Sequence, residues 1–232
     1  MEPKPIGPYS LFRFAGDIVF VSGQLGIDPQ GQKRDIVEQT KNALMNIKNI
    51  LSSIGIEVSD IVKATIFTTD IDRFSDINAA WAEFFRDSKF LPSRSTVGVS
   101  SLPRGALIEI EVFALVRTPI SLFYAGRHFF LNEDFSVAHE YFEKAWRKDK
   151  KNMYQGLSIL SAFCDKLASG IFSDELLKKA FDKILKGKDE GFDLDKVQLS
   201  DLKHKVLEIR DKGALDLLKD FVSKIQSVSK IL

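Results

Sequence analysis

The sequence has few of the side chains that most catalytic sites use. Its 232 residues include one cysteine, Cys164, and three histidines, and residues 1–117 contain neither type. A single cysteine excludes an intrachain disulfide and a multi-cysteine metal site. The absence of histidine and cysteine from the first half excludes a histidine-based triad and a thiol nucleophile there. Catalysis in that half would therefore use Arg, Lys, Asp, Glu, Tyr, Ser, Thr or backbone groups.

Long apolar runs and an excess of one charge are also lacking. The longest stretch without a charged residue, residues 152–164, has 13 residues, whereas a membrane-spanning helix needs roughly 20. The N-terminus lacks the basic start and apolar core of a signal peptide. With 33 basic and 32 acidic residues, the formal net charge is +1, so nothing indicates nucleic acid or an anionic membrane as a partner. We expect a cytoplasmic protein.

Common catalytic motifs are missing as well. The chain contains no Walker loop, no G-x-G-x-x-G, no H-E-x-x-H and no G-x-S-x-G, the motifs of the best-known nucleotide, metal and serine-nucleophile sites. What is present is an ordinary globular composition, 44% hydrophobic and 28% charged. This length can form one large domain or two of roughly 100–120 residues, each with its own core.

Strand-like and helix-like stretches alternate in the first half. Runs of β-branched and aromatic residues predict strands, and apolar residues at three- and four-residue spacing predict helices. The expected strands are residues 8–14, 17–23, 61–69, 93–100 and 107–117, and the expected helices are 35–54 and 74–87. Two such helices most simply cover one face of a single sheet. We therefore predict an α+β domain with the order β-β-α-β-α-β-β.

The pattern changes at Pro119, because proline cannot continue a strand ladder. Beyond it, strand signals almost disappear and apolar residues recur with helical spacing. We predict an all-α bundle with helices at residues 120–131, 134–148, 152–168, 173–186, 198–210 and 213–229. Residues 1–117 hold 13 basic and 14 acidic residues, and residues 118–232 hold 20 and 18. These balanced charges favour two compact domains with those bounds.

Three charged residues of the first domain interrupt apolar strand patterns: Arg94, Glu109 and Glu111. Because side chains alternate along a strand, Arg94 shares a face with Thr96 and Gly98, and Glu109 shares a face with Glu111. Two structural explanations stay open. The charges belong to the solvent faces of half-buried strands, or an arginine and a glutamate pair across adjacent strands.

The same residues also belong to a longer pattern. Along the chain it reads I-G-P-Y-S at residues 6–10, V-S-G-Q at 21–24, Q-T at 39–40, D-I-V-K-A-T at 60–65, F-x-x-I-N at 74–78, P-S-R-S-T-V at 92–97 and L-P-x-x-A-L-I-E-I-E at 102–111. Each fragment alone is weak, but their common order and spacing are specific. Residues 5–116 resemble the RidA/YjgF family of enamine/imine deaminases.

This resemblance implies a chorismate-mutase-like fold and a homotrimer with active sites in the clefts between subunits. It implies hydrolysis of 2-iminobutanoate or 2-iminopropanoate to the 2-oxo acid and ammonia. These reactive imines arise from PLP-dependent dehydratases acting on threonine and serine. The resemblance implies no metal and no organic cofactor.

The resemblance also assigns roles to individual residues. Arg94 matches the arginine that binds the substrate carboxylate, a task suited to a guanidinium because it binds carboxylates bidentately. Glu109 matches the glutamate that positions or activates water as a general base. Four further residues match family positions near the substrate: Tyr9, Gly23, Asn78 and Thr96. Thr96 is expected to contribute its backbone N–H. Glu111 is expected to be structural.

The chain departs from the family pattern at Leu11, where many members have glutamine, and at Thr96, where some have cysteine. Structural alternatives remain for Tyr9, at the edge of the core, and for Asn78, on a helix surface or cap. A second function also stays open, in which the pocket senses 2-oxo acids or small carboxylates and the helical domain is its output. RNA cleavage has been attached to the family, but the neutral charge and the lack of an aromatic and basic strip disfavour it here.

The second domain carries one recognisable stretch. Residues 138–146 read A-H-E-x-x-E-x-x-W, and Q-G-L follows at 155–157. On these motifs, residues 122–186 resemble a small helical family of unassigned function. We expect the helical domain to sit outside the trimer and to modulate assembly, substrate access or partner choice.

The polar residues of this stretch allow two interpretations. His139, Glu143 and Trp146 share one helix face, and Glu140 lies one turn from Glu143. A histidine and two carboxylates are metal ligands in principle. The interpretation that we favour is a buried polar network, in which His139 bonds a glutamate and Trp146 covers the core.

Overall fold

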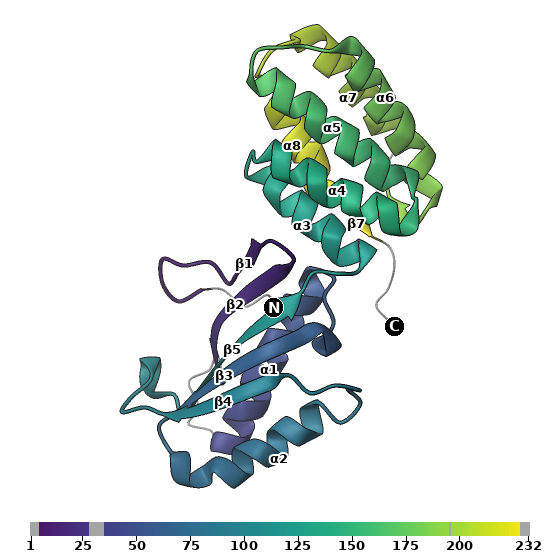
Figure 1. The fold of residues 1–232 in the computed structure, drawn as a ribbon. Helices are drawn as coiled ribbons and strands as arrows, with labels where there is room; N and C mark the ends of the chain where they lie inside the picture. Colours follow the sequence, from purple (N-terminus) through teal and green to yellow (C-terminus); the bar gives the residue numbers. More distant parts are fainter. Residues whose placement is uncertain (1–4, 28–34, 195, 228–232) are drawn as a thin grey trace. The chain divides into compact units, whose positions relative to one another are not determined.

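The computed structural model describes residues 5–27, 35–194 and 196–227. The chain divides into two compact units, residues 1–116 and 117–232 (Figure 1). Among the described residues, no helix combines the length and the apolar character that crossing a bilayer requires.

The first unit is a mixed five-stranded sheet with two helices on one face (Figure 1). Its strands are β1 (Phe12–Ala15), β2 (Ile18–Leu25), β3 (Ile61–Thr68), β4 (Ser93–Gly98) and β5 (Ile108–Leu115). They lie in the order β1-β2-β5-β3-β4, and only β3 and β4 run parallel. The helices are α1 (Ile36–Ser53) and α2 (Phe74–Phe84). The predicted α+β class and element order are confirmed.

The two faces of this sheet differ in burial. One face, covered by α1 and α2, holds side chains that are almost fully buried, such as Ala64 and Ile66 of β3 and Ile110 of β5. The apolar positions predicted on the first helix pack on this side, because Ala43, Leu44, Ile47, Ile50 and Leu51 are all buried in α1. The opposite side is called the open face below, and it carries Phe20, Lys63, Thr65, Phe67, Val97, Glu109, Glu111 and Phe113.

Short caps and turns set the ends of these elements. The carboxylate of Asp35 accepts the N–H of Glu38 at 3.0 Å and caps the start of α1. Gly55, predicted as the stop of this helix, has a φ of +67° and lets the chain turn back. Three 3-10 segments join the larger elements, at η1 (Val58–Asp60), η2 (Ile71–Arg73) and η3 (Pro103–Gly105).

The second unit is helical, as predicted. Its helices are α3 (Pro119–Leu131), α4 (Phe135–Asp149), α5 (Asn152–Ala168), α6 (Asp174–Lys186), α7 (Lys196–Ile209) and α8 (Ala214–Lys224). Thr118 caps α3, since its hydroxyl accepts the N–H of Ser121 at 3.0 Å. The predicted cap Ser173 likewise accepts the N–H of Leu176 at 3.3 Å.

Two predicted boundaries were wrong for physical reasons. The first strand begins at Phe12 and not at residue 8, because Pro8 has no N–H and Tyr9 donates its own to the Gly7 carbonyl at 2.9 Å in a local turn. The helix predicted over 74–87 ends at Phe84, where the chain enters a turn.

The end of the second unit also differs from the prediction. α8 ends at Lys224, whereas helical spacing predicted a helix to residue 229, and residues 228–229 lie outside the described part of the chain. Ile225 is extended and buried, and β7 (Gln226–Ser227) pairs with β6 (Phe192–Asp193). Burial of Ile225 and this short ladder, both tertiary effects, replace the last helical turn.

Candidate active site

Arg94 lies on the helix-covered face of the sheet and is held by α2. Its Nη2 donates to Oδ1 of Asn78. Its Cζ lies 5.0 Å from the ring centre of Trp81 and 5.6 Å from that of Phe74, within the range of cation–π attraction. Phe74, Asn78 and Trp81 are at positions i, i+4 and i+7, so one face of α2 orients the guanidinium.

The charge of Arg94 has no carboxylate partner within the described ranges. Partial burial removes water from the guanidinium and lowers the pKa of Arg94, but an arginine remains charged at any working pH. A guanidinium has five N–H donors, and Asn78 engages only Nη2. A half-buried, oriented and unneutralised cation is suited to bind a carboxylate ligand bidentately.

Thr96 adds a backbone donor beside Arg94. β4 is the edge strand of the sheet, and Val99 donates its N–H to Thr68 of β3 at 2.8 Å. Because backbone groups alternate along a strand, the N–H of Thr96 points the other way, toward the free edge. The Thr96 hydroxyl is buried and lacks a hydrogen-bond partner among the described residues.

Glu109 lies on the open face of β5, against a bulge in β2. The pairing of β2 with β5 shifts between Val21 and Gln24, so Gly23 falls in the bulge. A Cβ at Gly23 would lie 1.8 Å from Oε1 of Glu109, so only glycine leaves room for this carboxylate. Burial, and secondarily the nearby Glu111, raise the pKa of Glu109.

Arg94 and Glu109 therefore lie on opposite faces of one sheet. Arg94 is paired with Ala64 of β3, and Glu109 is paired with Phe67 of the same strand. These two β3 residues are three apart, so their side chains and those of their partners point in opposite directions. A cross-strand ion pair between Arg94 and Glu109 is excluded, and a solvent-face explanation is wrong for Arg94.

The six predicted site residues fall into two clusters and one separate residue. Asn78, Arg94 and Thr96 surround one corner of the covered face, and Gly23 and Glu109 form the second cluster, as described above. Tyr9 precedes β1 and is 44% exposed, so it is not part of the core of this chain. Its hydroxyl accepts the N–H of Ile6 at 3.3 Å.

Two residues of the arginine cluster were missed from the sequence, Phe74 and Trp81. Their spacing around Asn78 within a predicted helix was a usable signal, because positions i, i+4 and i+7 share a face. The spacing could not show which residue this helix face contacts, because no local pattern indicates that α2 packs beside β4.

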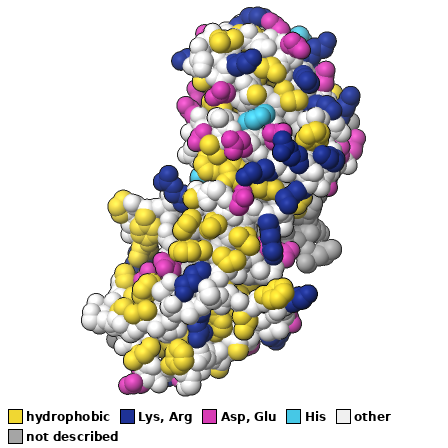
Figure 2. All heavy atoms as spheres, in the orientation of Figure 1, with side chains coloured by type: hydrophobic (Ala, Val, Ile, Leu, Met, Phe, Trp, Pro, Cys, Tyr) yellow, Lys and Arg dark blue, Asp and Glu magenta, His cyan; other side chains and the backbone are white. Residues whose placement is uncertain are grey.

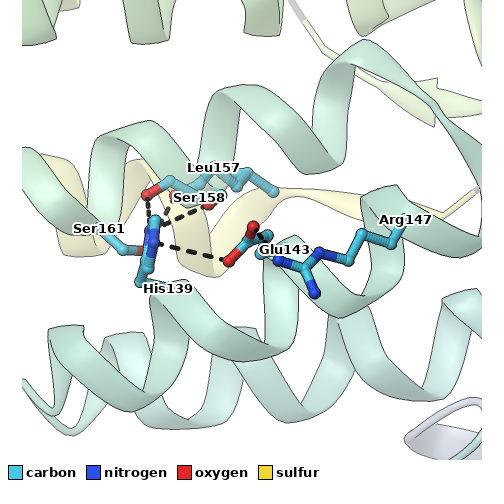
Figure 3. A network of polar contacts seen from close by, with 6 residues as sticks. All are labelled: His139, Glu143, Arg147, Leu157, Ser158 and Ser161. Atoms are coloured by element: carbon cyan, nitrogen blue, oxygen red, sulfur yellow. Dashed lines mark hydrogen bonds and ion pairs between the residues drawn. The ribbon is translucent and has the colours of Figure 1, made fainter.

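In the second unit, His139 of α4 is bound to α5 (Figure 3). Its Nδ1 lies 2.8 Å from the Ser158 carbonyl oxygen and 2.9 Å from Oγ of Ser158. A carbonyl only accepts, so Nδ1 carries a proton. Nε2 lies 3.9 Å from Glu143, which also pairs with Arg147 at 2.8 Å. A polar network is present, but it is not buried as predicted, since the side chains of His139 and Glu143 are 40% and 36% exposed. The hydrogen bonds of His139 also go to Ser158 and not to a glutamate.

The metal interpretation of this stretch finds no support in the described part of the chain. No group of three or more His, Cys, Asp or Glu side chains there is arranged to hold a metal ion. Glu140 is exposed. Trp146 is partly covered and lies under the ammonium of Lys150, 4.4 Å from the ring centre. His139 therefore serves as a polar link between two helices.

Comparisons with known proteins match the first unit. The family model described as Endoribonuclease L-PSP matches residues 1–116. A RutC family protein from Pyrococcus horikoshii is 46% identical over 115 residues, which are 48% of this chain and 90% of that protein. A protein from Capra hircus named 2-iminobutanoate/2-iminopropanoate deaminase is 40% identical over 116 residues, which are 49% of this chain and 83% of that protein.

Solved structures match the same half. The crystal structure of E. coli TdcF with bound serine is 39% identical and covers 49% of this chain and 91% of its own, with a TM-score of 0.46. The YjgF gene product from E. coli is 37% identical and covers 50% of this chain and 93% of its own, with a TM-score of 0.47.

Proposed function

The chain belongs to the Endoribonuclease L-PSP family, which includes the proteins named RidA, and from this membership we propose that its first unit is a 2-imino acid deaminase. The reaction is the hydrolysis of 2-iminobutanoate or 2-iminopropanoate to the 2-oxo acid and ammonia. Relatives with this name are about 40% identical to the first unit. The observation that carries the proposal is the oriented, unneutralised guanidinium of Arg94.

In this proposal each cluster performs one part of the reaction. Arg94 binds the carboxylate of the imino acid, and the Thr96 N–H at the sheet edge contacts the substrate. Glu109 takes a proton from water as the water oxygen bonds to the imine carbon, and it returns this proton to the imine nitrogen to give the carbinolamine. The carbinolamine hydroxyl then gives its proton to the nitrogen by the same route, the C–N bond breaks with its electron pair leaving on ammonia, and the C–O bond becomes the carbonyl of the 2-oxo acid. The imine carbon is already electrophilic, so the reaction needs no covalent nucleophile.

A complete site then requires two copies of the chain. Arg94 and Glu109 of one copy face opposite sides of the sheet, so the arginine of one copy must meet the glutamate of the next. The open face supports association because it exposes apolar side chains, including Phe20 and Val97. Figure 2 shows hydrophobic side chains, in yellow, gathered on the first unit. They lie where Figure 1, in the same orientation, shows the strands of the sheet in front of α1. We propose a homotrimer with active sites between subunits, which is a heterologous, closed assembly.

RNA cleavage, to which the family description refers, is a weaker candidate. The first unit and Arg117 together hold 13 basic and 14 acidic residues. A nucleic-acid site requires a concentration of positive charge that neutralises phosphates. The balanced charge therefore favours a small monoanionic substrate.

The proposed reaction is testable by competition for the imine. Threonine dehydratase generates 2-iminobutanoate in the presence of semicarbazide, which traps imine faster than ketone. We expect the full chain to lower the semicarbazone yield and to raise free 2-oxobutanoate by the same amount. The sum of the two products stays constant, which controls for inhibition of the dehydratase. A yield equal to that in buffer would contradict the deaminase. Tight binding of 2-oxobutanoate without turnover would then favour the sensor function.

The pH dependence of turnover tests the role of Glu109. The base must be ionised, and its pKa is raised by burial and by Glu111. We therefore expect kcat/KM to fall on acidification at a pH above the ordinary range of glutamate, about 4.3. Replacing Glu111 with glutamine removes a like charge, so the acid limb should move to lower pH with activity retained. An unchanged limb in Glu111→Gln, measured by a pH–rate profile, would argue against Glu109 as the base.

A further inference from the structure

Apolar side chains lie near the Arg94 guanidinium. Phe74, whose ring lies against the guanidinium, is 42% exposed, whereas Trp81 on the same helix face is buried. Ile71 of η2 is 45% exposed. It lies over the next part of β4, since a Cβ at Gly98 would lie 3.5 Å from the Cβ of Ile71. Trp81 therefore supports the arginine from within, while Phe74 and Ile71 leave apolar surface for a ligand.

The charges around this surface disfavour a second carboxylate on the ligand. Residues 70–76 contain three aspartates and one arginine. That arginine, Arg73, binds Asp76 through Nε and lies 3.8 Å from Asp35. The charge of Arg73 is thus already paired. Asp70 and Asp72 leave the segment that carries Ile71 and Phe74 with a net negative charge, which disfavours an anionic side chain on the ligand.

We propose that Phe74 and Ile71 form the side-chain subsite of the Arg94 carboxylate site. The subsite selects 2-imino and 2-oxo acids with a branched or aromatic apolar side chain over those with a methyl or an acidic one. This inference rests on the proposed role of Arg94 as the carboxylate anchor. Phe74 is the specificity-determining residue, because its ring touches both the anchor and the space next to it.

Binding of stable 2-oxo acids tests the subsite without turnover. The dissociation constants of pyruvate, 4-methyl-2-oxopentanoate and 2-oxoglutarate are measured on the full chain by calorimetry. We expect the branched acid to bind about tenfold or more tightly than pyruvate, since each added methylene in an apolar pocket contributes roughly that factor. We expect 2-oxoglutarate to bind no better than pyruvate.

Variants assign the preference to the proposed residues. Phe74→Ala and Ile71→Ala should each reduce the ratio between the branched acid and pyruvate, while Phe74→Leu should largely retain it. Phe90→Ala is the matched control, because Phe90 is a more exposed phenylalanine in the loop before β4, and it should leave the ratio unchanged.

Each outcome decides a separate point. Equal affinity for the three acids, or an unchanged ratio in both Phe74→Ala and Ile71→Ala, overturns the subsite. Absence of binding by all three acids overturns the carboxylate anchor and the subsite with it. A preserved binding preference without imine hydrolysis supports the subsite and contradicts only the deaminase.

Discussion

Mixing two inactive variants, Arg94→Ala and Glu109→Gln, is expected to restore imine hydrolysis. Alone, Arg94→Ala loses the carboxylate anchor, and loss of a charge-assisted contact of this kind costs roughly 10²-fold or more. Glu109→Gln loses the base, which contributes typically about 10²–10⁴-fold. Because the two side chains lie on opposite faces of the sheet, each site in the proposed trimer takes one residue from each of two copies.

The expected recovery follows from counting sites. When equal amounts of the two variants are unfolded and refolded together, about a quarter of the sites in a closed heterologous trimer should contain both wild-type residues. The measurement is the semicarbazide competition, before and after co-refolding. Each variant refolded alone is the control for the procedure. If the mixture stays inactive while wild type refolds to full activity, Arg94 and Glu109 do not belong to one shared site.

Gly23→Ala is expected to lower kcat by about a hundredfold with little change in unfolding temperature. The added Cβ would lie 1.8 Å from Oε1 of Glu109 and 2.7 Å from its Cδ. Because these atoms are the end of a flexible side chain, the chain relieves the clash by moving the carboxylate and not the backbone. A displacement of about 1 Å in a catalytic group is enough for a loss of this size.

A double variant tests whether this loss acts through Glu109. In Glu109→Gln the carboxylate is already absent as a base, so adding Gly23→Ala should reduce kcat only slightly further. Gly213→Ala in the helical unit is the control for adding one methyl group. A Cβ there would lie 3.1 Å from its nearest atom, Oδ1 of Asp211, a much smaller overlap than the 1.8 Å at Gly23. Multiplicative losses in Gly23→Ala/Glu109→Gln would show that Gly23 acts independently of Glu109.

The elements with strong local signals were predictable. Residues 63–68 alternate between partly exposed and buried side chains, as expected for a half-buried strand. α1 buries the apolar positions chosen from its spacing. The failures occur where tertiary contacts outweigh spacing. Ile225 leaves a helical pattern to become buried, and β6 and β7 are two-residue strands that exist only because they pair with each other.

The candidate site divides in the same way. From the sequence alone it followed that Arg94 and Thr96 share one strand face and that Glu109 and Glu111 share another, because alternation of side chains is a local property of a strand. The resemblance to a family supplied their roles. Neither the alternation of side chains nor the family resemblance could place α2 beside β4. Phe74 and Trp81 were therefore missed.

Only the tertiary structure decided that the arginine and the glutamate are separated. β3 lies between β4 and β5, and its register pairs Ala64 with Arg94 and Phe67 with Glu109. Strand order and register depend on long-range packing of the sheet against its helices, which no local pattern encodes. The side-chain chemistry of the two residues was thus set by their identity in the sequence. Their placement on opposite faces, from which we propose that a second copy completes the site, was set by the sheet.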